Sequence, residues 1–264
     1  MPVPRPDPPR GLLNLDPVGG PVRIARYLPS QPLVHLVEHY WRVRWDLRGH
    51  PEFQTATLPY PSIHVVLENG CWTITGVLTA RRFEHTLRDV GAVFGIKFTP
   101  GGFRPFVDES VASFTNRTCE ASPILPLVAE LPRDPSQPDA RLVERAESVL
   151  LDHLPAVDGR VAEVGRLVQA IADQREIVRV EQVVPLADMS LRALQRLFRE
   201  YVGVGPKWVI QRYRLFEAAE RLMAGDVDGA QVAHELGYFD QAHFIRDFKS
   251  MVGSSPRAFA IGTR

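Results

Sequence analysis

The fold is decided by two ten-residue stretches near the C-terminus, FREYVGVGPK at residues 198–207 and FKSMVGSSPR at residues 248–257. They align without a gap at a spacing of fifty residues, and their phenylalanine, glycine and proline positions coincide. Upstream, Ser190 aligns with Asp240, and both residue types are good helix N-caps. A glycine followed three residues later by a proline is a strong helix stop. The repeat therefore predicts two copies of a unit in which a capped helix ends at a glycine.

Each capped helix is preceded by a shorter helical segment, at about residues 180–187 and 228–236, and by a tight turn. A short helix, a tight turn and a second helix make a helix-turn-helix unit. We expect one side of each second helix to pack against the first. The predicted packing positions are Leu194, Leu197 and Phe198 in the first unit and Phe244, Ile245 and Phe248 in the second.

The opposite side of each capped helix carries residues that can read base edges or neutralise phosphates. The predicted base contacts are Arg192, Gln195 and Arg196 in the first unit and Gln241, His243 and Arg246 in the second. The predicted phosphate contacts are Arg199, Lys207 and Lys249, together with the helix N-termini at Ser190 and Asp240. This composition favours double-stranded DNA as the partner. A duplicated helical bundle with solvated charges would show similar helices.

Between the units, a helix is predicted from Pro206 to Met223, with proline at its first position and Gly225 just past its end. About 18 residues at 1.5 Å each give a rod of roughly 27 Å. Successive major-groove faces of DNA lie about 34 Å apart. One chain could therefore lay both capped helices into adjacent segments of the major groove.

The stretches ELGYFDQAHFIRDFKSMVGSSPRAF and MSLRALQRLFREYVGVGPKWVIQRYRLFEAAERL resemble the AraC/XylS family of bacterial transcription regulators, over about residues 177–260. The resemblance implies a double helix-turn-helix domain that binds DNA, and it adds Ala242 to the base-contacting positions. An alanine there can at best touch a thymine methyl group. The sequence departs from the family pattern at Val184, Pro185 and Asp188, and Pro185 should shorten or bend the first helix of its unit.

The N-terminal half has a different pattern of apolar and turn residues. Residues 1–16 are rich in proline and predict a flexible tail, and residues 17–131 alternate short apolar runs with turn residues. Asn69-Gly70 predicts a hairpin, and GAVFGIKF predicts a strand that stops before Pro100. The segment VHLVEHYWRVRW predicts a helix up to about Tyr40 and then a strand.

These patterns predict an α+β protein of two domains. A β-rich, barrel-like domain covers residues 17–131, a Pro-rich linker and helical connector covers 132–174, and an all-α DNA-binding domain covers 175–264. VEHYWRV, LPYPSIHVVLENG and GIKFTPGGFRPF resemble an uncharacterised sensor-like domain that precedes this DNA-binding domain in some family members. That resemblance implies a cupin-like barrel with a pocket for a small ligand.

Histidines in the N-terminal half raise the question of a metal site. His35 and His39 stand in an H-x-x-E-H pattern, which on a helix is typical of an inverted zinc protease site. Such a site needs a third ligand, and no second motif singles out Glu109 or Glu120. A cupin metal site is not favoured either, because H-x-H is missing. We therefore expect no metal, no cofactor and no catalytic residue, and we name a candidate ligand pocket of His39, Trp41, His64 and Glu68.

Amino-acid composition limits the remaining possibilities for partners and cellular location. Lys+Arg and Asp+Glu both total 31, so net charge neither favours nor excludes nucleic acid. Two cysteines cannot build a disulfide framework, and no apolar run is long enough to span a membrane. We expect a cytoplasmic monomer or homodimer, with RNA polymerase and a small-molecule effector as candidate partners. The alternative is a cupin-like small-molecule-binding protein or a metalloenzyme whose helical domain makes protein contacts.

Overall fold

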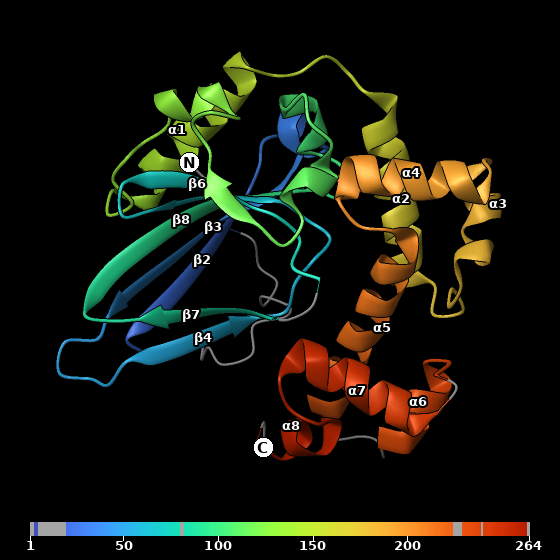
Figure 1. Cartoon of the computed structure of the whole chain (residues 1–264). Coiled ribbons are helices and arrows are strands. Elements are labelled where there is room, and N and C mark those ends of the chain that lie inside the picture. Colours follow the sequence, from blue (N-terminus) through green and yellow to red (C-terminus); the bar gives the residue numbers. More distant parts are fainter. Residues whose placement is uncertain (1–2, 5–19, 80–81, 224–228, 239, 263–264) are drawn as a thin grey trace.

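The computed structural model describes residues 3–4, 20–79, 82–223, 229–238 and 240–262. Its N-terminal half is built of strands and its C-terminal half of helices, which confirms the predicted α+β architecture (Figure 1). Gly225 and most of the predicted N-terminal tail lie outside the described residues. No helix in the described part of the chain is both long and apolar enough to cross a membrane.

The main sheet has seven antiparallel strands. In spatial order they are β1 (Val3–Pro4), β2 (Val22–Leu28), β3 (Val37–Asp46), β8 (Val90–Phe98), β5 (His64–Glu68), β6 (Cys71–Thr75) and β9 (Thr118–Glu120). Strands β4 (Phe53–Thr57) and β7 (Phe83–Leu87) pair with each other in a separate two-stranded ribbon. The N-terminal half is thus β-rich, as predicted, and its two sheets do not close into one continuous barrel within the described residues.

Local turn chemistry behaves as the sequence predicts. The hairpin of β5 and β6 turns at Asn69 and Gly70, which have φ values of 50° and 78°. Both values are positive, as a two-residue type I′ turn requires. Strand β8 ends at Phe98, just before Pro100.

The predicted helix up to Tyr40 is wrong. A single 3-10 turn, η1 (Gln31–Leu33), is followed by strand β3 from Val37 onward. Hydrogen bonds to β2 on one side and β8 on the other hold this segment extended. Tertiary pairing therefore overrides the local helical spacing.

Two hydrophobic layers cover the main sheet. Helix α1 (Asp139–Asp152) packs Leu142 and Val143 onto one face, in a core that includes Tyr40 and Phe94. The β4–β7 ribbon covers the other face, where Leu87 packs near Trp45 and Val93. Figure 1 shows α1 and the ribbon on opposite sides of the sheet. Three 3-10 helices complete this half: η2 (Arg104–Phe106), η3 (Val111–Phe114) and η4 (Pro126–Glu130).

The C-terminal half contains the remaining helices. They are α2 (Gly159–Asp173), η5 (Val180–Gln182), α3 (Val184–Ala187), α4 (Leu191–Val202), α5 (Pro206–Met223), α6 (Gly229–Glu235), α7 (Gln241–Val252) and α8 (Pro256–Gly262). One core joins α2, α3 and α4 to the start of α5, and a second joins α6, α7 and α8 to the end of α5. Helix α5 therefore connects two separately packed helical units (Figure 1).

Candidate nucleic-acid interface

The two helical units share their helix caps. The Ser190 hydroxyl accepts a hydrogen bond from the Ala193 amide at 3.2 Å, and the Asp240 carboxylate accepts one from the His243 amide at 2.6 Å. Helix α4 ends at Gly203 with φ 90° and ψ −13°, and α7 ends at Gly253 with φ 89° and ψ −10°. These matched ends confirm the repeat of two capped, glycine-terminated helices that the sequence predicts.

The turns before the capped helices differ slightly. The left-handed residue is Asp188 in the first unit, with φ 48°, and Gly237 in the second, with φ 69°. The first helix of the first unit is broken into η5 and the four-residue α3, which contains Pro185. This confirms the expectation that proline shortens that helix, because proline lacks the amide that would continue the ladder.

The inner sides of the capped helices are buried with one exception. Leu194, Phe198, Phe244 and Phe248 are each fully buried, as predicted. Ile245 is 37 % exposed, so its predicted packing position is wrong. It lies four residues from Gln241 and four from Lys249, both exposed, so the three share the outer face of α7. The stripe of residues 241, 245 and 249 has helical spacing just as the predicted stripe does, so the sequence alone does not decide on which face Ile245 lies.

On α4, the predicted DNA-contacting side chains lie together. Arg192, Gln195, Arg196 and Arg199 are all exposed, and with Glu200 and Ser110 they line a hollow of about 350 Å³. Ser110 belongs to the N-terminal half and lies at the edge of this basic face. The structure therefore brings four of the predicted residues to one surface, beside the β-rich domain.

On α7, the corresponding face is also open. Gln241, Ala242, Arg246 and Lys249 are exposed. His243 is only half-exposed, because its ring packs edge-on against Tyr238 at 5.4 Å and its Nε2 lies 3.3 Å from an Asp247 carboxylate oxygen. Its assignment to base contact stays a prediction.

The two capped helices lie at opposite ends of α5 (Figure 1). Helix α5 has 18 residues, so it spans roughly 27 Å. Lys207 is exposed in its first turn, between the two units along the chain. The arrangement matches a spacer for two neighbouring segments of one DNA groove.

The β-rich half contacts the end of α4 directly. The Thr115 hydroxyl donates to the Gly203 carbonyl at 2.7 Å, and the Ser110 hydroxyl donates to the Arg199 carbonyl at 3.4 Å. Arg104 donates to the Glu200 carboxylate at 2.7 Å. The Arg199 carbonyl also accepts from the Gly203 amide at 3.2 Å, so the N-terminal half adds a second donor there and supplies a donor to the Gly203 carbonyl just past the helix.

A second set of contacts reaches α5 and α7. The Thr79 carbonyl accepts from Trp208 Nε1 and from Arg212 Nη2, both at 3.3 Å. Arg82 donates to the Val252 carbonyl at the end of α7. Burial lowers the pKa of Arg212 to about 10, and its Nε and Nη1 have no hydrogen-bond partner. These contacts tie both helix-turn-helix units to the β-rich half.

The candidate ligand-pocket residues lie on the ribbon-facing side of the sheet, but they do not form one cluster. Trp41 Nε1 donates to His64 Nδ1 at 3.2 Å, whereas Glu68 pairs with His85 at 3.0 Å. His64 and Glu68, four residues apart on β5, thus have different partners. The Trp41 indole also covers Gly95, since a Cβ there would lie 2.2 Å from the ring. Part of the expected pocket is thus filled by an indole.

Lys97, which sequence reasoning missed, lies near His39 together with Glu38, the glutamate of the H-x-x-E-H pattern. A β-bulge at residues 37–39 accompanies a contact of 2.9 Å between the Glu38 carboxylate and Lys97 Nζ. Glu38 also lies 3.3 Å from His39 Nδ1. Burial would raise the pKa of Glu38, but Lys97 and His39 outweigh it and lower that pKa. Burial and Lys97 lower the pKa of His64 to about 3, so its ring is neutral at pH 7.

The H-x-x-E-H pattern does not form a helical pair of histidines. His35 is exposed in the turn before β3, whereas His39 is buried on the strand. Among the described residues, no group of three or more His, Cys, Asp or Glu side chains is arranged to hold a metal ion. Glu109 and Glu120, the candidate third ligands, lie in the loop before η3 and at the end of β9.

Two capped recognition helices on one connecting helix define the class of the C-terminal half, a double helix-turn-helix DNA-binding domain. Residues 186–260 match the family model described as "Helix-turn-helix domain". Residues 25–120 match a "Domain of unknown function (DUF6597)", within the predicted β-rich domain. The match confirms the predicted helix-turn-helix domain in the C-terminal region.

Known relatives agree with this class. The chain is 31% identical over 70 residues to the HTH-type transcriptional activator RhaS of Pectobacterium carotovorum, covering 26% of this chain and 25% of RhaS. It is 26% identical over 155 residues to an uncharacterized HTH-type transcriptional regulator of Haemophilus influenzae, covering 52% of each. The chain thus spans from a quarter to about half of the length of these relatives.

Among solved structures, the DNA-binding domain of AdpA in complex with a target DNA is similar at 26% identity. The match covers 41% of this chain and 95% of that chain, with a TM-score of 0.34.

Proposed function

We propose that this protein is a sequence-specific DNA-binding transcription regulator whose two helix-turn-helix units read adjacent major-groove segments. The observation that carries the proposal is the pair of exposed basic faces on α4 and α7, with the same caps and the same ends, joined by one helix. A bundle that served only protein contacts would have no need of two equivalent arginine-bearing faces one helix length apart.

On each of these two faces, some residues would contact bases and others would contact phosphates. Arg192, Gln195 and Arg196 on α4 would contact base edges, as would Gln241, Ala242 and Arg246 on α7. A good bidentate contact contributes about 1–3 kcal/mol of discrimination against the wrong base. Ile245, exposed beside them, offers an apolar group for a thymine methyl.

Phosphates would be held by the cations and amides that flank these residues. Arg199, Lys207 and Lys249 supply the exposed positive charges, and the N-termini of α4 and α7, behind Ser190 and Asp240, supply amides. Phosphate contacts set register without reading sequence.

The β-rich half would modulate this binding. Its hydrogen bonds to the ends of α4 and α7 give it a physical route to both units. A small-molecule effector acting through this half, contact with RNA polymerase and action as a monomer or homodimer in the cytoplasm belong to the same proposal. No enzymatic step is part of it.

The test has two stages. DNA bound by the full-length chain is first selected from a random pool, and the selected site is then compared with a scrambled site in gel-shift titrations. The wild-type chain should bind the selected site more tightly, and binding should weaken steeply with added salt. Equal affinity for the selected and scrambled sites would contradict the proposal.

The Arg246→Ala variant sharpens that test. Arg246 is exposed and forms no ion pair within the described residues, so its removal should change stability by less than about 0.5 kcal/mol. Discrimination between the two sites should fall roughly five- to 150-fold, the equivalent of about 1–3 kcal/mol. Arg141→Ala, which removes an exposed arginine of α1, is the matched control and should leave discrimination unchanged.

A further inference from the structure

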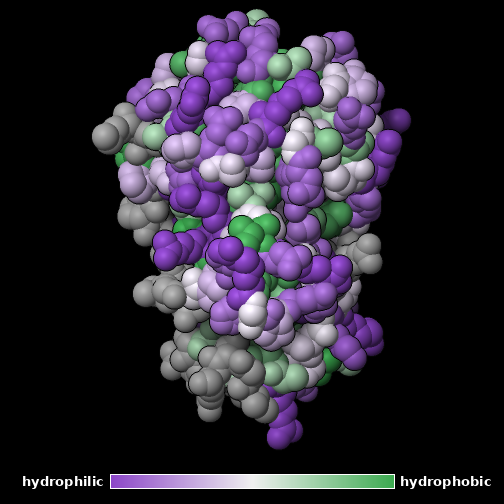
Figure 2. All heavy atoms as spheres, turned by 90° about the vertical axis from the view of Figure 1, so that its left-hand side faces the viewer, coloured by the Kyte–Doolittle hydropathy of each residue, from purple (hydrophilic) through white to green (hydrophobic). Residues whose placement is uncertain are grey.

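An open hollow lies at the end of the main sheet where β3 finishes and β8 begins, far along the sheet from α4. Its volume is about 800 Å³, and the hairpin turn at Asn69-Gly70 and the loop at 133–136 enclose its sides. This end of the sheet lies on the left in Figure 1 and faces the viewer in Figure 2, where hydrophilic side chains surround a small hydrophobic area. The hollow is separate from the candidate pocket residues His39, Trp41, His64 and Glu68, none of which lines it.

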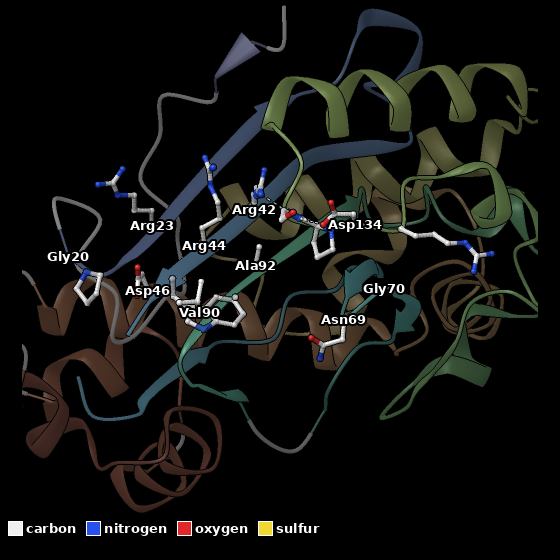
Figure 3. Close-up of a pocket in the computed structure, with 16 residues that line it drawn as sticks. Gly20, Arg23, Arg42, Arg44, Asp46, Asn69, Gly70, Val90, Ala92 and Asp134 are labelled. Atoms are coloured by element: carbon white, nitrogen blue, oxygen red, sulfur yellow. Dashed lines mark hydrogen bonds between the residues drawn. The ribbon is translucent and has the colours of Figure 1, made fainter. Parts of the chain in front are cut away.

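Four arginines line this hollow, against two carboxylates. Arg23, Arg44 and Arg42 stand side by side along it in Figure 3, and Arg133 comes from the enclosing loop. Arg23 and Arg44 are direct cross-strand partners of β2 and β3. Like charges directly opposite each other are destabilising. Asp139, 3.1 Å from Arg44, offsets part of this repulsion, and an anion beside Arg23 would offset more of it.

The available carboxylates are already engaged. Asp46 accepts from Arg48 at 2.5 and 2.9 Å, and Asp134 accepts from the Ser136 amide at 2.8 Å. Asp139 lies 2.5 Å from Arg42 and 3.1 Å from Arg44. Within the described ranges, no carboxylate pairs with Arg23 or Arg133.

Arg42 connects the hollow to the buried interior of the β-rich half. Its side chain is 1 % exposed, and it donates to the carbonyls of Pro135 and Gln137 in the enclosing loop. Its Nε nevertheless has no hydrogen-bond partner. That atom is also closed off from solvent, so the groups that remain to bind a ligand in the hollow are the exposed guanidinium groups of Arg23, Arg44 and Arg133.

Apolar side chains form part of the remaining walls. Trp45, Val90, Ala92 and Pro135 line the hollow, and Val90 is 55 % exposed. Guanidinium groups bind carboxylate and phosphate oxygens in paired hydrogen bonds. Apolar walls beside them suit a carbon skeleton rather than a bare inorganic ion.

We propose that this hollow binds a small organic anion that carries at least two carboxylate or phosphate groups. Arg23 and Arg44 bind one acidic group from the sheet, and Arg133 binds a second from the enclosing loop. The inference concerns the β-rich half alone and goes beyond the DNA-binding function.

The test is calorimetric titration of the full-length chain at constant ionic strength, with citrate in one arm and pyrophosphate in the other. Saturable binding in the citrate arm assigns a polycarboxylate, and binding in the pyrophosphate arm assigns a phosphate-bearing ligand. Arg23→Gln and Arg44→Gln should each weaken that binding at least about tenfold. Arg23→Gln is the cleaner variant, because Arg23 holds no other described group in place.

The matched control is Arg88→Gln. Arg88 is an exposed arginine of the neighbouring β7–β8 turn, it pairs with Glu52 at 2.6 Å, and it does not line the hollow. Its removal lowers the net charge equally and should change affinity by less than about twofold. The proposal is overturned if neither anion binds, if Arg23→Gln and Arg44→Gln bind as the wild type does, or if Arg88→Gln weakens binding as much as they do.

Discussion

The glycines that end α4 and α7 provide a matched pair of substitutions within one chain. Gly203 and Gly253 differ by only 1° in φ and 3° in ψ, at 90° and −13° against 89° and −10°. Forcing an alanine into this left-handed conformation costs about 1–2 kcal/mol at either position. Any further difference between Gly203→Ala and Gly253→Ala must come from their surroundings.

Those surroundings differ in kind. A Cβ at Gly203 would lie 3.0 Å from both the Val111 carbonyl oxygen and Thr115 Oγ1, whereas at Gly253 it would lie 2.7 Å from Arg82 Nη1. Arg82 ends a flexible side chain and can swing aside, losing a partly exposed hydrogen bond of about 1 kcal/mol. Backbone at Val111 can move only if η3 moves, and overpacking of this kind costs about 1–3 kcal/mol. Gly203→Ala should therefore cost about 2–5 kcal/mol and Gly253→Ala about 2–3 kcal/mol.

Amide hydrogen exchange read by mass spectrometry suits this comparison, because it reports local opening in each unit separately. Gly203→Ala should speed amide exchange in α4. It should also speed exchange in η3, because the added Cβ displaces Thr115, which follows η3 and donates to the Gly203 carbonyl. Gly253→Ala should speed exchange in α7 and leave η3 unchanged. Equal effects of the two variants, or an unchanged η3 in Gly203→Ala, would refute the claim that η3 is packed against the end of α4.

Two further outcomes follow from the described contacts. His64, neutral in the fold with a pKa of about 3, takes up a proton more readily when unfolded, so stability should fall as pH drops below about 6.5. Between pH 7 and pH 5, urea unfolding should show a loss about 1–2 kcal/mol larger in the wild type than in His64→Gln. Asp240→Ala should destabilise α7 by about 1 kcal/mol in thermal unfolding, and Asp240→Ser should recover most of it, as Ser190 caps α4. An Asp240→Ser variant as unstable as Asp240→Ala would contradict the capping role.

The C-terminal half could be predicted closely because its determinants are local and occur twice. Caps and left-handed glycines act within a few residues, so Ser190, Gly203 and their partners fifty residues on define the helix ends by themselves. Ile245 was misplaced because 244, 245 and 248 fit a helical stripe as well as 241, 245 and 249 do. Only the packing of α7 against α5 and α6 decides which stripe faces inward.

The N-terminal half was harder because its decisive contacts are non-local. Residues 35–40 fit both a helix and a strand by spacing, and the pairing of β3 with β2 and β8 decides between them. Lys97 sits opposite both His39 and His64 only because β8 lies between β3 and β5. No spacing of residues in the sequence predicts that order of strands. The division of the chain at residues 132 and 175 stays a prediction; α1 packs with the sheet, whereas α2 packs with the first helix-turn-helix unit.

The β-rich half contacts the two helix-turn-helix units through different kinds of side chain. This difference affects how a displacement in the β-rich half could reach each unit. At α4, two hydroxyls of the η3 region, from Ser110 and Thr115, donate to main-chain carbonyls of the recognition helix. At α7, one arginine side chain, Arg82, makes the corresponding contact. A short hydroxyl transmits a shift of its own backbone, whereas a long arginine can absorb one by changing rotamer. A displacement of η3 would therefore move the end of α4, beside Arg199, while α7 could keep its place. Under the proposed function, the first unit is therefore the one whose DNA contacts a change in the η3 region would alter more directly.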